Sequence, residues 1–225
     1  MSGHRRATRA RLLGTVALGA AGYGTLVRPR LLTWGATAAE AARAYPGDEL
    51  VPGGRPTTMA TTLPAPPERV WPWLAQMGCD RGGWYSWDRL DNGGRPSARR
   101  IVPEWQELKE GQRLHAVPGG GTWFTVALLE PRRTLVLRMD VELPSGRPFE
   151  VRTGPLPGAY LDAVWGFHLS PDPGGGTRLV VRTRGRSRPR LLLRPVDLLF
   201  GEPAHFVMQL RQFRNLRARV GTTEE

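Results

Sequence analysis

The chain has 225 residues, of which 40% are hydrophobic, and it carries a formal net charge of +12 and a single cysteine. This length supports one full hydrophobic core, and one cysteine excludes an internal disulfide framework. No group of His and Cys residues has the spacing of a zinc site, so we expect neither a bound metal nor a cofactor. Lys109 is the only lysine, so the basic residues are otherwise all arginines. No nucleic-acid-binding motif accompanies these arginines, so we do not expect nucleic acid as the partner.

Residues 1–33 combine a basic leader with an uncharged stretch. Four arginines between residues 5 and 11 precede LLGTVALGAAGYGTLV, and Arg28 and Arg30 follow it. A transmembrane helix needs about 20 apolar residues and a signal-peptide core about 7–15, so the stretch lies between the two. Three interpretations stay open: a retained membrane anchor, an export signal, and a helix packed on the domain. We favour the anchor, which predicts a membrane-associated protein; without it we expect a cytoplasmic one.

Residues 34–55 are expected to form an arm or linker. WGATAAEAARAY has a short helical pattern, and PGDELVPGGRP is dense in proline and glycine. The core domain is expected at residues 56–221, followed by a tail at 222–225.

The core domain begins with one strand and one helical stretch. TTMATTL is rich in β-branched residues and places Met59 and Leu63 on one face, which predicts a strand. APPERVWPWLAQM has apolar residues at helical spacing, from Val70 to Met77. Because a proline inside a helix removes a hydrogen bond, we expect Pro72 to split this stretch into two short helices.

From Gly111 onward the apolar pattern has a period of two. GQRLHAV, TWFTVALLE, TLVLRMDVE, AYLDAVWGFHLS and TRLVVRTRGR follow one another with short Gly/Pro-rich turns, which predicts an antiparallel meander. Alternation defines one face, expected to be concave and to carry Trp123, Thr125, Ala127, Leu129, Leu135, Leu137, Met139, Val141, Ala163, Trp165, Phe167, Leu169, Leu179, Val181 and Thr183.

The last of these strands carries arginines on its opposite face. Arg182, Arg184 and Arg186 occupy alternate positions. We interpret them as a solvated edge strand protected by charge. The alternative is a basic stripe, from Arg178 to Arg194, that rests on anionic lipid headgroups.

The chain ends in a long amphipathic helix. Its apolar residues repeat at three- and four-residue steps, and its other face is mostly Arg and Gln; the stripe consists of Phe206, Leu210, Phe213, Leu216 and Val220. Only the concave sheet is large enough to cover this stripe. The sequence therefore predicts an α+β fold in which a curved antiparallel sheet wraps around a long C-terminal helix, with an apolar helix at the N-terminus.

Several motifs resemble a known superfamily. They are APPERVWPWLAQMG, RGGWYSWD, RIVPEWQELKEGQRL, GGGTWFTVALLEP, TRLVVRTR and EPAHFVMQLRQF. Together they resemble a bacterial branch of the START-like, Bet v 1-like superfamily, also called SRPBCC, of the polyketide cyclase/dehydrase and lipid transport type. The resemblance covers most of residues 34–220. It implies a helix-grip fold with a deep pocket between sheet and helix, used in the superfamily for lipids, sterols, polyketides and hormones, and it carries over no catalytic residue.

The aromatic residues and histidines near this expected pocket are the candidate ligand-binding residues. They are Trp84, Tyr85, Trp87, Trp105, His115, Trp123, Met139, Trp165, Phe167, His205 and Met208. WYSWD follows the predicted helices, where its aromatic rings would form the wall of a pocket mouth or pack the helices against the sheet. Each candidate is either a pocket wall or part of a filled core, because alternation shows only which residues point inward.

Three carboxylates are candidate acid–base groups. Asp88 and Asp91 are either a pair for proton transfer or a hydrogen-bonded turn, and we favour the turn. Glu104 is either a buried acid or a carboxylate that stabilises a turn, and again we favour the turn.

Histidines and the cysteine complete the candidates. His115 and His205 lie where either would face the cavity, and we expect a structural role for His205. His168 alternates outward and should be exposed. Cys79 is expected to be a small buried residue, since no Ser-His-Asp or Cys-His arrangement follows from the spacing.

Three hypotheses about function result. The first is binding of a hydrophobic small molecule or lipid between sheet and helix, with transport as an extension of binding. The second is a polyketide cyclase or dehydratase that uses the same pocket, with His115, Asp88 or Glu104 moving a proton. The third and weakest is an anionic-surface or nucleic-acid binder, which requires a contiguous basic face.

Overall fold

The computed structural model describes residues 14–15, 18–19, 21–151 and 154–221. The N-terminal elements are η1 (Tyr23–Val27), α2 (Arg28–Leu32), α3 (Ala38–Ala42) and η2 (Asp48–Leu50). The strands are β1 (Arg55–Leu63), β2 (Arg113–His115), β3 (Trp123–Glu130), β4 (Thr134–Glu142), β5 (Tyr160–Pro171) and β6 (Thr177–Arg188). The remaining helices are α4 (Pro67–Ala75), α5 (Asp88–Asp91), η3 (Pro103–Trp105), α6 (Arg190–Val196), η4 (Asp197–Gly201) and α7 (Glu202–Gly221).

The strands form one sheet in the order β1-β6-β5-β4-β3-β2, with every neighbouring pair antiparallel. The predicted α+β class and antiparallel sheet are therefore confirmed. Because β1 pairs with β6 along its whole length, β6 lies inside the sheet. The prediction that its arginines protect an edge strand is wrong.

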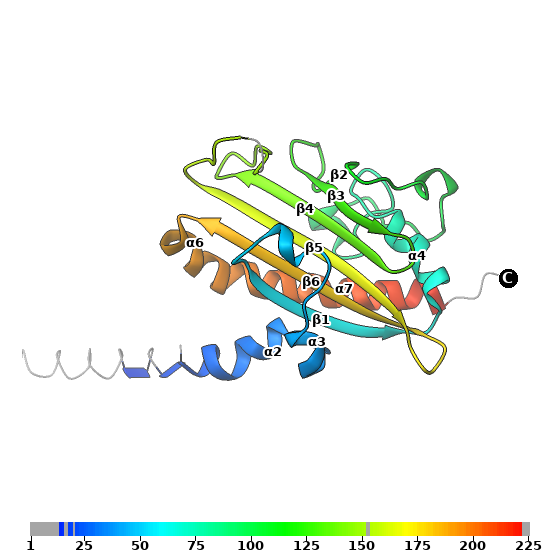
Figure 1. Ribbon diagram of the computed structural model, residues 1–225, viewed down its shortest axis with the longest axis horizontal. Helices are drawn as coiled ribbons and strands as arrows, with labels where there is room; N and C mark the ends of the chain where they lie inside the picture. Colours follow the sequence, from blue (N-terminus) through cyan, green and yellow to red (C-terminus); the bar gives the residue numbers. More distant parts are fainter. Residues whose placement is uncertain (1–13, 16–17, 20, 152–153, 222–225) are drawn as a thin grey trace, which may run out of the picture.

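The long C-terminal helix lies against one face of this sheet. α6, the π-helical turn η4 and α7 follow one another without interruption, and Figure 1 shows α7 running behind the strands. Phe213, Leu216 and Val220 are buried in the main core, with Phe206 and Leu210 partly buried against it. The predicted apolar stripe is confirmed, and the arrangement of sheet and helix is consistent with a helix-grip fold.

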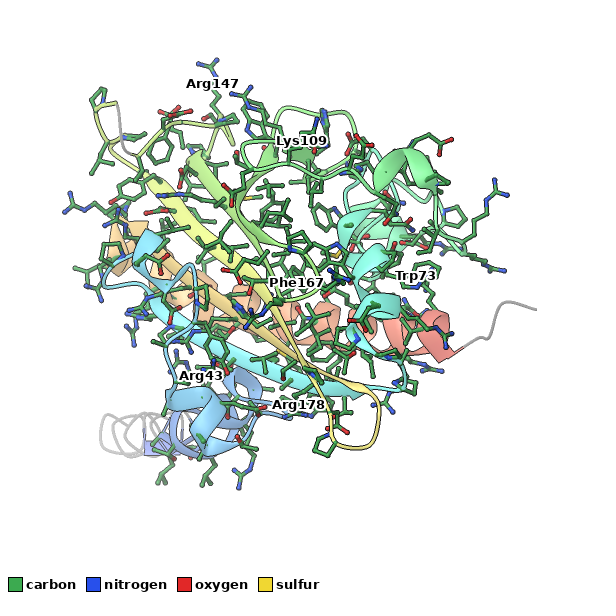
Figure 2. All side chains as sticks on the ribbon, turned by 45° about the vertical axis from the view of Figure 1, so that its right-hand side comes forward. Arg43, Trp73, Lys109, Arg147, Phe167 and Arg178 are labelled. Atoms are coloured by element: carbon green, nitrogen blue, oxygen red, sulfur yellow. The ribbon has the colours of Figure 1, made fainter. Side chains whose placement is uncertain are left out.

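The core lies between the concave face and the helices α4 and α7. It includes residues from four strands at the predicted alternate positions, namely Met59, Leu63, Leu135, Leu137, Phe167, Leu169, Leu179 and Val181. Phe167 lies near the middle of the molecule in Figure 2 and is fully buried. Burying a side chain of this size contributes about 1.5–3 kcal/mol, so these alternating residues are the main source of stability.

Strand β3 departs from the predicted alternation. Its pairing with β4 shifts between Val126 and Leu128, which marks a bulge. Phe124 and Val126 join the core, whereas Trp123 stacks on the guanidinium of Arg113, 4.4 Å from its ring centre. The inward orientation predicted for Trp123 and for two neighbours on its face, Thr125 and Ala127, is wrong, because the strand is apolar on both faces and the bulge resets its phase.

Helix α4 remains one helix although Pro72 lies inside it. The expected split at Pro72 is wrong. The helix ends three residues beyond the proline, at Ala75, so the missing N–H affects only its last turns. Its buried residues Val70, Trp73 and Leu74 still reach the core as predicted.

An arm at residues 34–54 lies across the outer face of the sheet, on the opposite side from α7 (Figure 1). Arg178 contacts Glu40 at 2.7 Å, and Arg182 donates two hydrogen bonds of 3.0 Å to Asp48. The side chain of Arg182 is only 7% exposed. Arg178 and Arg182 therefore hold the arm, and the expectation that the arginines from Arg182 to Arg186 are solvated is wrong, because Arg184 also pairs with Asp48 and Arg186 pairs with Asp162 of β5.

The same arm covers His168. Alternation places this residue on the outer face, as predicted, but Tyr45 stacks on its ring at a centroid distance of 4.8 Å. His168 is only 8% exposed, so the prediction of an exposed histidine is wrong. Burial lowers the pKa of His168 to about 4.

At the N-terminus, η1 and α2 pack beside the first part of the C-terminal helix. The Tyr23 hydroxyl donates to the carbonyl of Leu198 at 3.2 Å, and Arg28 binds Glu202 at 2.7 Å. Within the described part of the chain no helix is both long and apolar enough to cross a membrane. The predicted anchor falls partly on residues 1–13, 16–17 and 20, which, with the tail at 222–225, lie outside the described residues.

Candidate functional site

Four aromatic rings meet on the concave side of the sheet. They belong to Trp84, Phe124, Trp165 and Phe167, and we call them the aromatic cluster. The ring of Trp165 lies 5.5 Å from Trp84, 5.7 Å from Phe124 and 4.8 Å from Phe167. β5 supplies two of the rings and β3 one, while Trp84 comes from the loop after α4. Edge-on and tilted contacts at these distances are favourable and give the cluster rigid walls.

Helix α7 brings a row of polar side chains to the same region. His205, Gln209 and Gln212 follow one another at four- and three-residue steps, and we call them the polar row. Gln209 donates to Gln212 at 2.7 Å, and Gln212 donates to the carbonyl of Trp84 at 2.9 Å. These bonds join Gln209 and Gln212 to the backbone at Trp84, a member of the aromatic cluster, and His205 lies about one helical turn before Gln209.

The two glutamines were not predicted to face inward. Gln residues were expected on the outer side of the helix, but Gln209 and Gln212 are only 2% and 1% exposed. The signal was present in their spacing with Leu216, four residues beyond Gln212, which continues the same side of the helix into the core.

Three buried polar atoms in this region lack a partner. Among the described residues, none forms a hydrogen bond with Trp165 Nε1, His205 Nε2 or Gln209 Oε1. A buried donor or acceptor left without a bond costs about 1–3 kcal/mol. Trp165 can only donate and the Gln209 oxygen can only accept. The region therefore holds both an unpartnered donor and an unpartnered acceptor beside apolar side chains.

His205 is a weak base in this environment. Burial lowers its pKa to about 4, so the imidazole is neutral near pH 7. It can take part in one hydrogen bond through Nε2, as donor or acceptor according to its tautomer.

Two other predicted residues lie near the polar row and the concave face. Met208 is half-buried on α7, and its carbonyl accepts a hydrogen bond from Ser86 at 3.2 Å. Met139 is half-buried on β4, in step with Leu135 and Leu137 of the core. In the described part of the chain, neither side chain belongs to the main core or packs against it.

The WYSWD motif divides between three surroundings. Trp84 belongs to the aromatic cluster, whereas Tyr85 is fully buried beside Gln76, whose amide donates to its hydroxyl at 2.9 Å. Burial raises the pKa of Tyr85. Trp87 is 43% exposed, with the guanidinium of Arg211 5.0 Å from its ring centre. Tyr85 thus packs the helices against the sheet, which is one of the two roles expected for the motif. Of the three aromatic residues, only Trp84 lies in the aromatic cluster.

The structure does not bring Trp105, His115 and Trp123 to the aromatic cluster. Trp105 is half-buried in η3, where its carbonyl accepts a hydrogen bond from Arg81. His115 and Trp123 face each other in the pairing of β2 with β3. In the described part of the chain, none of the three belongs to the main core or packs against it.

The candidate acids also lie outside the cluster. Glu104 is exposed, and Asp88 accepts a hydrogen bond from the Ser97 hydroxyl, as expected for a turn. Asp91 is buried, and burial together with the neighbouring Asp88 raises its pKa to about 6. Cys79 is buried as predicted. Among the described residues, no group of three or more His, Cys, Asp or Glu side chains could hold a metal ion.

A separate cleft opens at one end of the sheet. It measures about 330 Å³ and is lined by Thr62, Leu63, Pro64, Asp172, Gly174, Gly175, Gly176 and Arg217. None of the predicted ligand-binding residues lines it, so the candidate site and this cleft are distinct.

Comparison with known proteins gives structural likeness only. No family model and no curated protein matches the chain. Among solved structures, the protein MLL2253 from Mesorhizobium loti is 19% identical, with 76% of this chain and all of that chain covered and a TM-score of 0.45. DynU16, a protein of the dynemicin biosynthetic locus, is 18% identical, with 72% and 46% covered and a TM-score of 0.41. CalU16 from Micromonospora echinospora is 17% identical, with 74% and 84% covered and a TM-score of 0.35. At these values the likeness identifies neither family nor ligand.

Proposed function

We propose that the chain binds a hydrophobic small molecule between the aromatic cluster and the polar row of α7. The observation that carries this proposal is the set of three unpartnered buried atoms, on Trp165, His205 and Gln209, next to apolar walls. Native proteins satisfy most buried polar groups. A ligand with an aromatic or aliphatic body and a hydroxyl or carbonyl group would satisfy these atoms.

The positions of the acid–base candidates favour binding over catalysis. A general acid or base must come within hydrogen-bond reach of the substrate. Glu104 is exposed, Asp88 accepts a hydrogen bond from Ser97, and His115 lies opposite Trp123 in the pairing of β2 with β3, outside the aromatic cluster. His205 is the titratable group of the polar row, and its lowered pKa makes it a poor base near neutral pH.

The arm argues against nucleic acid as the partner. Arg178 and Arg182 are engaged by Glu40 and Asp48 on the outer face of the sheet. Arginines paired in this way are not available to phosphate groups. The number of arginines free to bind phosphate on this face of the sheet is therefore smaller than the net charge of the chain suggests.

The test compares 2-naphthol with naphthalene by isothermal titration calorimetry on the full chain. The two probes share their apolar rings, and only 2-naphthol has a hydroxyl. A preference of about tenfold for 2-naphthol is expected, because one buried hydrogen bond to an otherwise unpartnered group contributes about 1–3 kcal/mol.

Matched variants locate the effect. Trp165→Phe combined with Gln209→Leu keeps the apolar walls and removes two of the unpartnered atoms, so the preference should disappear. Trp123→Phe makes the same tryptophan change outside the core and should leave the preference intact. If neither probe binds, or if the preference survives the double variant, the proposal fails.

A further inference from the structure

The first half of the C-terminal helix exposes a large apolar surface. Its residues are Leu191, Leu192, Val196, Leu199 and Phe200, with exposures of 89%, 72%, 56%, 67% and 69%. We call them the α6 surface. Isolated exposed hydrophobic residues are ordinary, but five within ten residues of one helix are not.

The α6 surface is part of a firmly held element. The Tyr23 hydroxyl bonds to the carbonyl of Leu198, and Arg28 forms two hydrogen bonds of 2.7 Å with Glu202, both from the N-terminal helical segment. Figure 1 shows α6 at one end of the sheet and the N-terminal segment beside that end of the C-terminal helix. The segment adds the exposed residues Leu26 and Val27. Hydrophobic residues thus remain exposed although their backbone is fixed by packing.

Arginines are interleaved with these apolar residues. Arg188, Arg190 and Arg194 lie in or next to α6, and all are exposed. Over residues 188–207 the acidic side chains are Asp197 and Glu202, and the Glu202 side chain is 8% exposed and paired with Arg28. The net charge that faces outward around the α6 surface is therefore positive.

We propose that the α6 surface docks on an anionic lipid bilayer. A helix with exposed leucine and phenylalanine and adjacent arginines is suited to lie in the membrane interface, where the apolar side chains enter the acyl boundary. Arginine stems can extend along apolar surface and keep the guanidinium groups at the level of the phosphates. This mode requires no helix that crosses the membrane, and it is independent of the ligand proposed for the interior.

The test is flotation of the full chain with vesicles of phosphatidylcholine alone or with 30% phosphatidylglycerol. Binding to the anionic vesicles is expected, with weak binding to phosphatidylcholine. Leu192→Ser with Phe200→Ser should weaken binding at least tenfold, because it removes most of the inserted apolar area. Arg190→Gln with Arg194→Gln should weaken it by about 25-fold, since each arginine near the surface contributes about fivefold.

A matched control replaces an exposed leucine elsewhere. Leu90 is 72% exposed on α5, as exposed as Leu192 on α6, and Leu90→Ser should leave vesicle binding unchanged. All these positions are exposed, so circular dichroism should show unchanged unfolding temperatures. The proposal is overturned if the Leu192/Phe200 variant binds like the parent chain. It is also overturned if the parent chain is a dimer that does not bind vesicles and the Leu192/Phe200 variant is a monomer. In that case a second copy of the chain covers the surface.

Discussion

The buried ion pair between Asp48 and Arg182 is the contact whose loss should matter most for the arm. Arg182 donates through Nε and Nη2 to the two oxygens of Asp48, both at 3.0 Å, and the side chains are 7% and 10% exposed. Burial acts to raise the pKa of Asp48, but the hydrogen bonds from Arg182 and from the Tyr45 backbone, together with the charges of Arg182 and Arg184, outweigh it and lower that pKa. Asp48→Asn keeps the size of the side chain and removes the charge. It leaves the Arg182 guanidinium buried without a carboxylate.

The expected loss of stability is large. Removing one partner of a buried ion pair costs about 3–5 kcal/mol, against a total stability of about 5–15 kcal/mol for a domain. For a chain of this length each kcal/mol lowers the unfolding temperature by about 2–4 °C, so a decrease of roughly 10 °C is expected. Replacing both partners, Asp48→Leu with Arg182→Met, should recover much of the loss because no buried charge then remains unpaired.

Two measurements separate local from global effects. Thermal unfolding followed by circular dichroism reports the whole domain, and the rate of tryptic cleavage at the exposed Arg43 reports release of the arm. Glu107→Gln is the control, since Glu107 is an exposed carboxylate with no ion pair among the described residues. If Asp48→Asn changes both readouts no more than Glu107→Gln does, the arm is not held by this pair.

Three further outcomes follow from burial. His168, whose folded pKa of about 4 is below its unfolded value, should cost up to about 3 kcal/mol of stability as pH falls from 6.5 to 4, and urea unfolding of His168→Phe should lack this component. Asp91, whose pKa is raised to about 6, destabilises the fold as pH rises from 4 to 6, so Asp91→Asn should gain about 2 kcal/mol at pH 7.5 and nothing at pH 3.5. Phe167→Ala should cost about 3–5 kcal/mol in urea unfolding, whereas Trp123→Ala should cost about 1 kcal/mol; equal losses would contradict the placement of Trp123 outside the core.

Much of the inner layer was predictable because it follows local periodicity. In β5 the inward positions of Trp165, Phe167 and Leu169 come directly from alternation, which is fixed by strand geometry. The stripe of α7, from Phe206 to Val220, follows equally from helical spacing. In both elements one face is clearly more apolar than the other, so the phase of the pattern is unambiguous.

In strand β3, alternation does not predict which residues face inward. Its segment WFTVALL is apolar on both faces, so alternation could not decide between Trp123 and Phe124. The bulge after Val126 then changes the phase within the strand. A bulge of this kind depends on the pairing with β4, which is not encoded in the local pattern of one strand.

Long-range charge pairing was equally hidden. The alternating arginines of β6 predict a solvent-exposed face. The partners of Arg178 and Arg182, Glu40 and Asp48, lie more than 130 residues earlier in the chain, so the local pattern does not show the pairing. The same arm buries His168 against Tyr45. Only the folded arrangement brings these groups together. The local pattern therefore predicts exposed side chains at positions that the arm covers.

The two proposals occupy one continuous helix, which makes their independence testable. The α6 surface ends at Phe200 and the polar row begins at His205, five residues or about 7 Å farther along a helix. The Arg28–Glu202 pair lies between them. The Leu192/Phe200 variant should therefore lose vesicle binding and keep its affinity for 2-naphthol, and the variant of Trp165 and Gln209 should do the reverse. Loss of both activities in either variant would indicate that the helix itself had moved, and the assignment of separate sites would have to be abandoned.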